Sequence, residues 1–192
     1  MGTVLIVCQA NLCRSPMAEL LTRRAFAGRA GGEAVTVASA GTHAWTNRPM
    51  HPYAQQVLQE RDIDPSGFRA RQLSAEAVRT AGIVLTATRR HRAACVELEP
   101  AAVRRTFTIR QFARYAGALT PGPGDLLERI ELVRAAVPVG AAADDDLADP
   151  VDHPVDAFRR CAAYLASVSD LLAGLMTPSP PWTSPCPAVP RP

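Results

Sequence analysis

The pattern of apolar and polar positions predicts a chain in which strands and helices alternate. Four short apolar or β-branched runs are typical of strands; they occupy residues 3–7, 35–38, 82–86 and 104–109. Apolar positions recur at helical spacing in segments near residues 16–28, 51–60, 74–80, 88–97, 125–137 and 155–175, with a short helix around Phe112. This alternation favours an α/β fold with a mainly parallel sheet and helices on both faces.

Length and composition suit one domain followed by a short tail. The chain has 192 residues and is 47% hydrophobic, enough for a sizeable core. From residue 177 onward, seven of sixteen residues are proline, which is typical of a disordered or polyproline-like segment. We therefore expect a single domain over residues 1–176 and a proline-rich tail over residues 177–192.

Basic residues are concentrated in the first part of the chain. All 21 are arginine; residues 1–120 hold 16 of them against 8 acids, whereas residues 121–192 hold 5 against 10. A basic half would attract anionic substrates, although a solvated arginine-rich surface explains the same bias. Aromatic residues make up only 5% of the chain, and no basic helix carries interleaved aromatics. We therefore expect no nucleic-acid partner.

The N-terminal residues and the cysteines bear on location and metal binding. No basic leader region precedes the first apolar run, and no run is long enough to cross a bilayer, so we expect a cytoplasmic protein without membrane insertion. The five cysteines are Cys8, Cys13, Cys95, Cys161 and Cys186. Their odd number argues against a secreted disulfide framework, and Cys-x4-Cys is poor spacing for zinc. Cys161 falls on the apolar stripe of the last helix and is expected to be a buried structural thiol.

A Cys-x5-Arg motif lies between the first predicted strand and the first predicted helix. Residues 8–15 read Cys-Gln-Ala-Asn-Leu-Cys-Arg-Ser, and Pro16 follows. Ser15 is suited to cap the helix and Pro16 to occupy its first turn. Unpaired backbone N–H groups and the positive end of the helix dipole make such a junction an anion site. The predicted phosphate-binding residues are Gln9, Ala10, Asn11, Leu12, Cys13, Arg14 and Ser15.

The spacing of this motif has a mechanical reason. Five intervening residues let the backbone curl around a tetrahedral dianion with successive N–H groups pointing inward, while Arg14 grips two oxygens in bidentate fashion. Cys8 then lies beneath the phosphorus, where the same N–H groups and the helix dipole favour its thiolate form. Ser15 is placed to donate a hydrogen bond to that thiolate. The motif therefore predicts a phosphate-cradling loop that carries its own nucleophile.

Cleavage of a phosphate ester also requires a group that protonates the leaving oxygen. The best candidate is Asp149, because the following Pro150 stiffens the backbone beside it. The competing carboxylates, for which a solvated acidic loop is the simpler interpretation, are Asp144, Asp145, Asp146 and Asp152.

Residues 39–42, Ser-Ala-Gly-Thr, follow the second predicted strand and suggest a turn of small residues. They lie at the carboxyl end of a strand, where ligand sites occur in open α/β sheets. Trp45 comes shortly after them and could form a wall of such a site. A tryptophan packed on the surface is the alternative.

Together these motifs resemble the low-molecular-weight protein tyrosine phosphatase family. Residues 7–19 are similar to the family's N-terminal signature, residues 39–42 to its second motif and residues 149–150 to its acid loop, and the likeness extends nearly to Met176. The resemblance implies a single-domain, three-layer α/β/α fold with a four-stranded parallel sheet, of the phosphotyrosine phosphatase I-like type. It also implies a hydrolase without metal or cofactor that acts on a phosphotyrosine protein or a small phosphate ester. We expect a monomer or weak dimer.

The resemblance assigns roles to the chemical groups. It implies that Cys8 is the nucleophile that forms a phosphocysteine intermediate and that Arg14 clamps the transition state. Asp149 is implied to act first as general acid and then as general base on the hydrolytic water. Cys13 is implied to form a protective disulfide with Cys8 under oxidation.

The resemblance also assigns supporting roles. Asn11 and Ser39 are implied to hold the loop by hydrogen bonds, and Leu12 and Trp45 to line the substrate cleft. Leu12 further bears on substrate choice, because the phosphoarginine branch of the family prefers threonine there. Its aliphatic side chain argues mildly against that branch.

Four departures from the family pattern stand out. The family usually has glycine at the position of Ala10, so the loop would be strained there if that residue needs a positive φ. Phe68 stands where many members carry a histidine that supports the asparagine, which predicts an incomplete hydrogen-bond network. Val151 replaces the usual aromatic residue after the acid, which weakens the case for a tyrosine-shaped entrance. An extra segment at about residues 115–143 precedes the acid loop.

Several other functions remain open from the residues. One is a phosphatase of another phosphate ester or of phosphoarginine. A second is a thioredoxin-coupled arsenate reductase built on the same loop, but its thiol relay needs two closely spaced cysteines in mid-chain and only Cys95 lies there. A third is a non-catalytic phosphate-binding module, which would be expected to lack Cys8, Arg14 or the acid.

Overall fold

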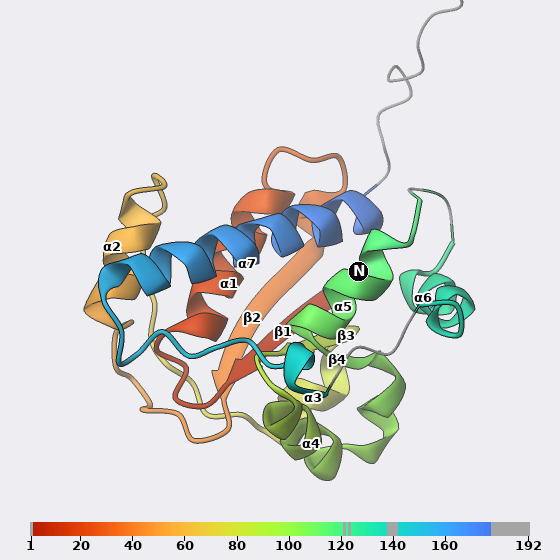
Figure 1. Cartoon of the computed structure of the whole chain (residues 1–192), viewed down its shortest axis with the longest axis horizontal. Helices are drawn as coiled ribbons and strands as arrows, with labels where there is room; N and C mark the ends of the chain where they lie inside the picture. The colour runs from red at the N-terminus through yellow and green to blue at the C-terminus, as the bar shows by residue number, and fades with distance from the viewer. Residues whose placement is uncertain (1, 121, 123, 138–141, 178–192) are drawn as a thin grey trace, which may run out of the picture.

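The computed structural model describes the chain except for residue 1, residues 121 and 123, residues 138–141 and residues 178–192. At its centre lies a four-stranded, all-parallel sheet with the strand order β2-β1-β3-β4 (Figure 1). The strands are β1 (Gly2–Cys8), β2 (Val35–Gly41), β3 (Ile83–Thr86) and β4 (Thr106–Thr108). The expected four-stranded parallel sheet is confirmed.

The helices fall where the apolar periodicity predicts them. The α-helices are α1 (Arg14–Phe26), α2 (Pro52–Gln59), α3 (Ala75–Thr80), α4 (Arg89–Leu98), α5 (Ile109–Gly117), α6 (Leu126–Arg134) and α7 (Val155–Met176). Short 3-10 helices occupy Gly32–Ala34, Pro100–Arg105 and Ala142–Asp145. One boundary prediction is wrong: residues 39–41, expected in a turn, continue β2. They do so because they pair in register with Ile6, Val7 and Cys8 of β1.

Strand β1 is buried on both of its faces. Val4 and Ile6 belong to the larger core, which is shared with α1, α5 and α7, whereas Leu5 and Val7 belong to a smaller core shared with α3 and α4. All four side chains are at most 3% exposed. Because alternate residues serve different cores, the strand is continuously apolar instead of alternating with polar residues.

The helices form a layer on each side of the sheet. Helices α1 and α7 cross one face together with α5, and α3 and α4 cover the other (Figure 1). Helix α7 is 22 residues long, and its buried side chains include Phe158, Leu165 and Leu172. These three side chains join the larger core, so the expected packing of the last helix against the sheet is confirmed.

The order of the strands creates a crevice at one end of β1. From β1 the chain passes through α1 to β2 on one side, while β3 pairs with the other side of β1. At such a reversal of strand order, the connections leave the strand ends in opposite directions and a ligand site opens between them. Cys8 is the last residue of β1 and therefore lies at this point.

Part of the extra segment before the acid loop forms helix α6. Asp125 caps it by accepting hydrogen bonds from the N–H groups of Leu127 and Glu128 at 2.9 and 3.1 Å, and Ile130 is fully buried in the larger core. Residues 121, 123 and 138–141 of this segment lie outside the described residues, as do residues 178–192 of the predicted tail. The domain boundaries therefore stay predictions. Over the described part of the chain, no helix combines the length and hydropathy needed to span a membrane.

Gly41 is required by a close backbone approach at the end of β2. A Cβ atom added there would lie 2.5 Å from the carbonyl oxygen of Gln9, well inside normal contact distance. We expect Gly41→Ala to lower the free energy of unfolding by about 2 kcal/mol, measured by urea denaturation. Gly67→Ala is the matched control, because nothing lies within 4 Å of its added Cβ; its effect should stay within about 0.5 kcal/mol. Equal stability of the two variants would contradict the close approach.

Candidate active site

The sulfur of Cys8 faces the hydroxyl of Ser15 at the junction of β1 and α1. The two atoms are 2.9 Å apart and both side chains are buried. Contrary to the expectation from the sequence, Ser15 is not the helix cap, because α1 begins at Arg14, two residues before the predicted start at Pro16. Cys13 occupies the cap position and offers no side-chain hydrogen bond. Ser15 lies instead in the first turn of α1, and its hydroxyl is directed at the thiol of Cys8, as the sequence predicts.

Hydrogen bonds from a neighbouring segment hold the carbonyl oxygens of the loop. Four of them accept hydrogen bonds of 2.9 to 3.1 Å from N–H groups of residues 42–51: Thr42 to Cys8, His43 to Gln9, Trp45 to Ala10 and His51 to Leu12. Among the described residues, the N–H groups of residues 9–13 have no backbone acceptor. Outward carbonyl groups leave these N–H groups on the inner side of the loop, next to the uncapped N-terminus of α1. That arrangement is suited to an anion.

The strained position of the loop is Asn11. Its φ is 57°, whereas Ala10 is absent from the residues with positive φ. The expectation that strain would fall on Ala10 is therefore wrong. Asparagine tolerates the left-handed region better than most residues, and Asn11 is fully buried.

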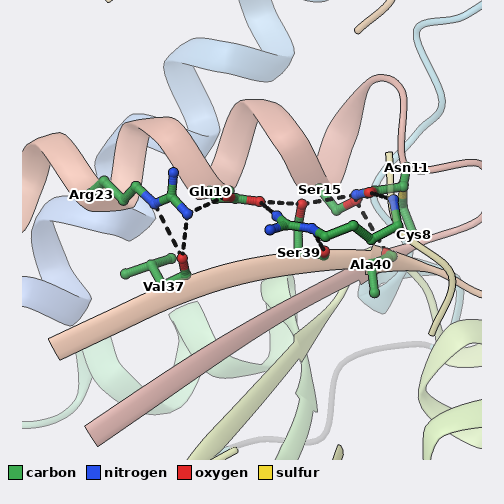
Figure 2. Close-up of polar contacts among 9 residues, drawn as sticks. Cys8, Asn11, Ser15, Glu19, Arg23, Val37, Ser39 and Ala40 are labelled. Atoms are coloured by element: carbon green, nitrogen blue, oxygen red, sulfur yellow. Dashed lines mark hydrogen bonds and ion pairs between the residues drawn. The ribbon is translucent and has the colours of Figure 1, made fainter. Parts of the chain in front are cut away.

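The amide of Asn11 is fully hydrogen-bonded (Figure 2). Its nitrogen donates to the hydroxyls of Ser15 and Ser39, both at 2.8 Å, and its oxygen accepts from the backbone N–H of Arg71 at 2.8 Å. The prediction that Phe68 leaves this network incomplete is wrong, because a backbone N–H supplies the missing donor. Since Ser15 accepts from Asn11, its own proton remains for the sulfur of Cys8 or for the more distant carbonyl oxygen of Ala40, 3.4 Å away.

A buried carboxylate, Glu19, extends this network along α1. It is 1% exposed, and one oxygen accepts from Ser39 and pairs with Arg71, each at 2.5 Å. Its other oxygen pairs with Arg23 at 2.5 Å (Figure 2). Sequence reasoning missed Glu19 and Arg71. The available signal was the Glu19–Arg23 pair at i,i+4, a spacing at which helical side chains meet.

Arg14 connects the loop with the acid 135 positions later. Its side chain is 6% exposed, donates to the carbonyl oxygen of Leu147 at 2.9 Å and forms an ion pair with Asp149. Its Nε has no hydrogen-bond partner among the described residues. Two other acids of the segment are engaged elsewhere, Asp145 with Arg114 and Asp146 with the backbone N–H of Arg89.

The remaining predicted residues surround the loop at different depths. Leu12 is half-buried and packs against the larger core. Trp45 is 63% exposed, and its backbone N–H donates a hydrogen bond to the carbonyl oxygen of Ala10 in the loop. Cys8 and Cys13 are both free thiols, so their disulfide stays a prediction. Burial, with the nearby charge of Asp149, raises the pKa of Cys13 to about 12.

Comparison with known proteins decides the family. Residues 3–128 match the family model described as low molecular weight phosphotyrosine protein phosphatase. The chain belongs to this family. The resemblance carried by residues 7–19 and 39–42 is thereby confirmed.

Relatives within the family differ in their substrates. A protein-arginine-phosphatase from Geobacillus stearothermophilus is 31% identical over 171 residues, which cover 88% of this chain and 93% of that protein. A probable low molecular weight protein-tyrosine-phosphatase EpsP from Ralstonia solanacearum is 42% identical over 83 residues, covering 43% of this chain and 53% of that protein. The solved structure of the YwlE arginine phosphatase from G. stearothermophilus matches with a TM-score of 0.68 at 30% identity, covering 90% of this chain and 91% of that one.

No metal centre is found in the described residues, since no three His, Cys, Asp or Glu side chains gather in a way that could hold an ion. The loop holds a thiol, and its guanidinium group contacts a carboxyl group. Cys95 lies in the smaller core, where burial raises the pKa of its thiol to about 12. Burial likewise raises the pKa of Cys161 to about 12, as its expected structural role requires.

A buried histidine near the site was also missed from the sequence. His91 lies in the first turn of α4, is 5% exposed, and its Nδ1 is 2.8 Å from the hydroxyl of Thr88. Burial, together with the charge of Arg14, lowers the pKa of His91 to about 4. The ring is therefore neutral at pH 7 and adds no positive charge beside Arg14.

This lowered pKa predicts a loss of stability in mild acid. The unfolded chain binds a proton at His91 below about pH 6.5, whereas the folded chain binds one only below about pH 4. The free energy of unfolding is therefore about 2 kcal/mol lower at pH 5 than at neutral pH. We expect His91→Asn to flatten the fall in unfolding free energy between pH 7 and pH 5, measured by urea denaturation. His43→Asn, at an exposed ring, should retain the wild-type slope. A His91→Asn slope equal to the wild type would contradict the assignment.

Proposed function

We propose that this chain is a protein tyrosine phosphatase that hydrolyses phosphotyrosine through a phosphocysteine intermediate. The observation that carries the proposal is that one loop holds the thiol of Cys8 against Ser15 and the guanidinium of Arg14 against the carboxyl of Asp149. The inward N–H groups of residues 9–13 would receive the phosphate oxygens. Family membership supports this chemistry.

The first step transfers the phosphoryl group to sulfur. The Cys8 thiolate forms a bond to phosphorus while the bond from phosphorus to the phenolic oxygen breaks, and the protonated carboxyl of Asp149 gives its proton to that oxygen. Arg14 supports the proposed geometry, because its Nε has no partner among the described residues. In the complex its guanidinium would donate from Nε and a terminal nitrogen to two equatorial oxygens.

The second step releases phosphate. Asp149, now ionised, accepts a proton from a water molecule whose oxygen forms a bond to phosphorus while the bond from sulfur to phosphorus breaks. Ser15 supports both steps, because its hydroxyl is 2.9 Å from the sulfur and stabilises the thiolate as it leaves. The sum of the two steps is hydrolysis of the ester, with the thiol and carboxyl returned to their starting states.

Phosphoarginine is the second candidate substrate. The relative that aligns along 88% of the chain is named a protein-arginine-phosphatase, and Val151 places no aromatic ring beside the acid. Phosphotyrosine remains first, because Leu12 offers an aliphatic surface and not a hydroxyl beside the nucleophile. Comparing kcat/KM for phosphotyrosine, phosphoarginine and sugar phosphate substrates separates the candidates; a higher value for phosphoarginine peptide would reverse the order.

Removing the nucleophile tests the reaction itself. We expect Cys8→Ser to lower turnover of an aryl phosphate by at least about a thousandfold, because the hydroxyl is a far weaker nucleophile. Binding of inorganic phosphate, measured by calorimetry, should persist. Cys95→Ala, which changes a thiol in the smaller core, is the control and should retain turnover. Undiminished turnover by Cys8→Ser would refute the mechanism.

Removing the acid should affect substrates according to their leaving groups. We expect Asp149→Asn to lower kcat/KM by about a hundredfold or more for phenyl phosphate, whose leaving oxygen needs a proton. The loss should be about tenfold or less for p-nitrophenyl phosphate, whose leaving oxygen does not. Asp152→Asn, at an exposed carboxyl in the same loop, is the control. Equal losses for the two substrates would move the acid role to another residue.

A further inference from the structure

A cavity adjoins the acid loop. Its volume is about 360 Å³, and it is lined by residues 147–150, by Arg110 of α5 and by side chains of α7. None of residues 8–15 lines it. The acid loop therefore has one side in contact with Arg14 and another side that forms a wall of this cavity. A volume of this size is enough for a side chain of a bound peptide.

The charged groups lining the cavity are mostly basic. Arg110, His153 and Arg160 line it, and the acid among its lining residues, Asp149, is already paired with Arg14. Arg160 and His153 are exposed, and neither has an acidic partner within 4.0 Å among the described residues. Arginine guanidinium groups without acidic partners in a concave surface attract an anionic ligand.

The adjacent arginine differs from Arg160 in its partners. Arg159 pairs with Glu60 of the segment after α2 at 2.7 Å and with Asp156 at 2.7 Å. These bonds also lower the pKa of Glu60 to about 2. Two consecutive arginines thus carry the same charge, but one is neutralised within the protein and the other borders the cavity.

The walls of the cavity suit a short acidic side chain. Pro150, Ala157 and the ring of Tyr164 provide apolar surface. Arg110 lies over that ring, 5.6 Å from its centroid, and donates to the carbonyl oxygen of Asp144 at 2.5 Å. Arg110 is thereby fixed in place, and the ring and proline can contact the methylene groups of a ligand while the cations meet its carboxylate.

We propose that this cavity is a subsite for an acidic residue that flanks the phosphorylated residue of a protein substrate. The inference rests on the proposed function, because it assumes that the phosphorylated side chain enters the loop of residues 8–15. Asp149 borders both places, so they lie a short distance apart. An extended peptide advances about 3.3 Å per residue, which lets one substrate occupy both. The subsite selects substrates by charge, with Arg160 as its main determinant.

The test compares matched phosphopeptides. A phosphotyrosine peptide of neutral residues receives a single Glu at each of the three positions on either side, with Gln at the same position as the reference. We expect the wild type to favour Glu over Gln about three- to tenfold in kcat/KM at one or two positions. Raising the salt concentration from about 20 mM to about 500 mM should reduce that preference, because ions screen exposed charges.

Variants at the two adjacent arginines locate the effect. Arg160→Gln should remove most of the preference for Glu, whereas Arg159→Gln should retain it. Arg160→Glu should invert it, so that a peptide with Arg at the selected position becomes the better substrate. An inverted preference cannot arise from misfolding, which would weaken turnover of every peptide alike.

The outcomes separate the subsite from the reaction. Turnover of aryl phosphate by the wild type with equal kcat/KM for the Glu and Gln peptides at every position would overturn the subsite and leave the proposed function standing. A preference for Glu that Arg160→Glu retains would also overturn it. If the folded wild type turned over neither aryl phosphate nor any peptide, the proposed function and the subsite would both fail.

Discussion

The outward direction of the carbonyl groups of residues 8, 9, 10 and 12 is the constraint on which the rest of the site depends. Each peptide unit presents its N–H and its C=O on opposite sides, so fixing the oxygens outside fixes the N–H groups inside. The segment of residues 42–51 supplies the donors, and Gly41 lets that segment approach the loop without a steric clash. Asn11 then turns the chain through a left-handed conformation. The cradle is therefore a product of two neighbouring strand ends and not of the loop alone.

Local patterns were sufficient to predict the elements but not their finer boundaries. The strands and helices could be located because the spacing of apolar residues follows which side chains are buried. In β1, for example, Val4 packs in the larger core and Leu5 in the smaller one, so the strand is apolar at consecutive positions. The extension of β2 through residues 39–41 depends on pairing with β1, which no window of sequence contains. The same holds for the start of α1, which lies at Arg14, two residues before the predicted Pro16.

The chemistry of the site was more predictable than its support. Cys8, Arg14 and Asp149 could be proposed because their residue types and spacing are demanded by phosphoryl transfer, and the structure places Arg14 against Asp149. Arg71 and His91 could not, since each acts through contacts made across different elements, and Glu19 offered only its i,i+4 spacing to Arg23. The amide oxygen of Asn11 accepts from the backbone N–H of Arg71, and a backbone donor leaves no trace in the residue type at Phe68.

The ion pair between Arg14 and Asp149 makes the acid an internal competitor of the substrate. While the carboxylate occupies the guanidinium, an incoming anion must exchange with it. A dianionic phosphate has the charge to do so, whereas a singly charged anion gains less from the same exchange. In the proposed mechanism, displacement of Asp149 from Arg14 leaves the carboxylate free to take up a proton from solvent, which it then gives to the leaving oxygen. In the proposed mechanism, the pairing therefore acts as a charge threshold for entry, and it couples the arrival of the phosphate to the freeing of the Asp149 carboxyl group.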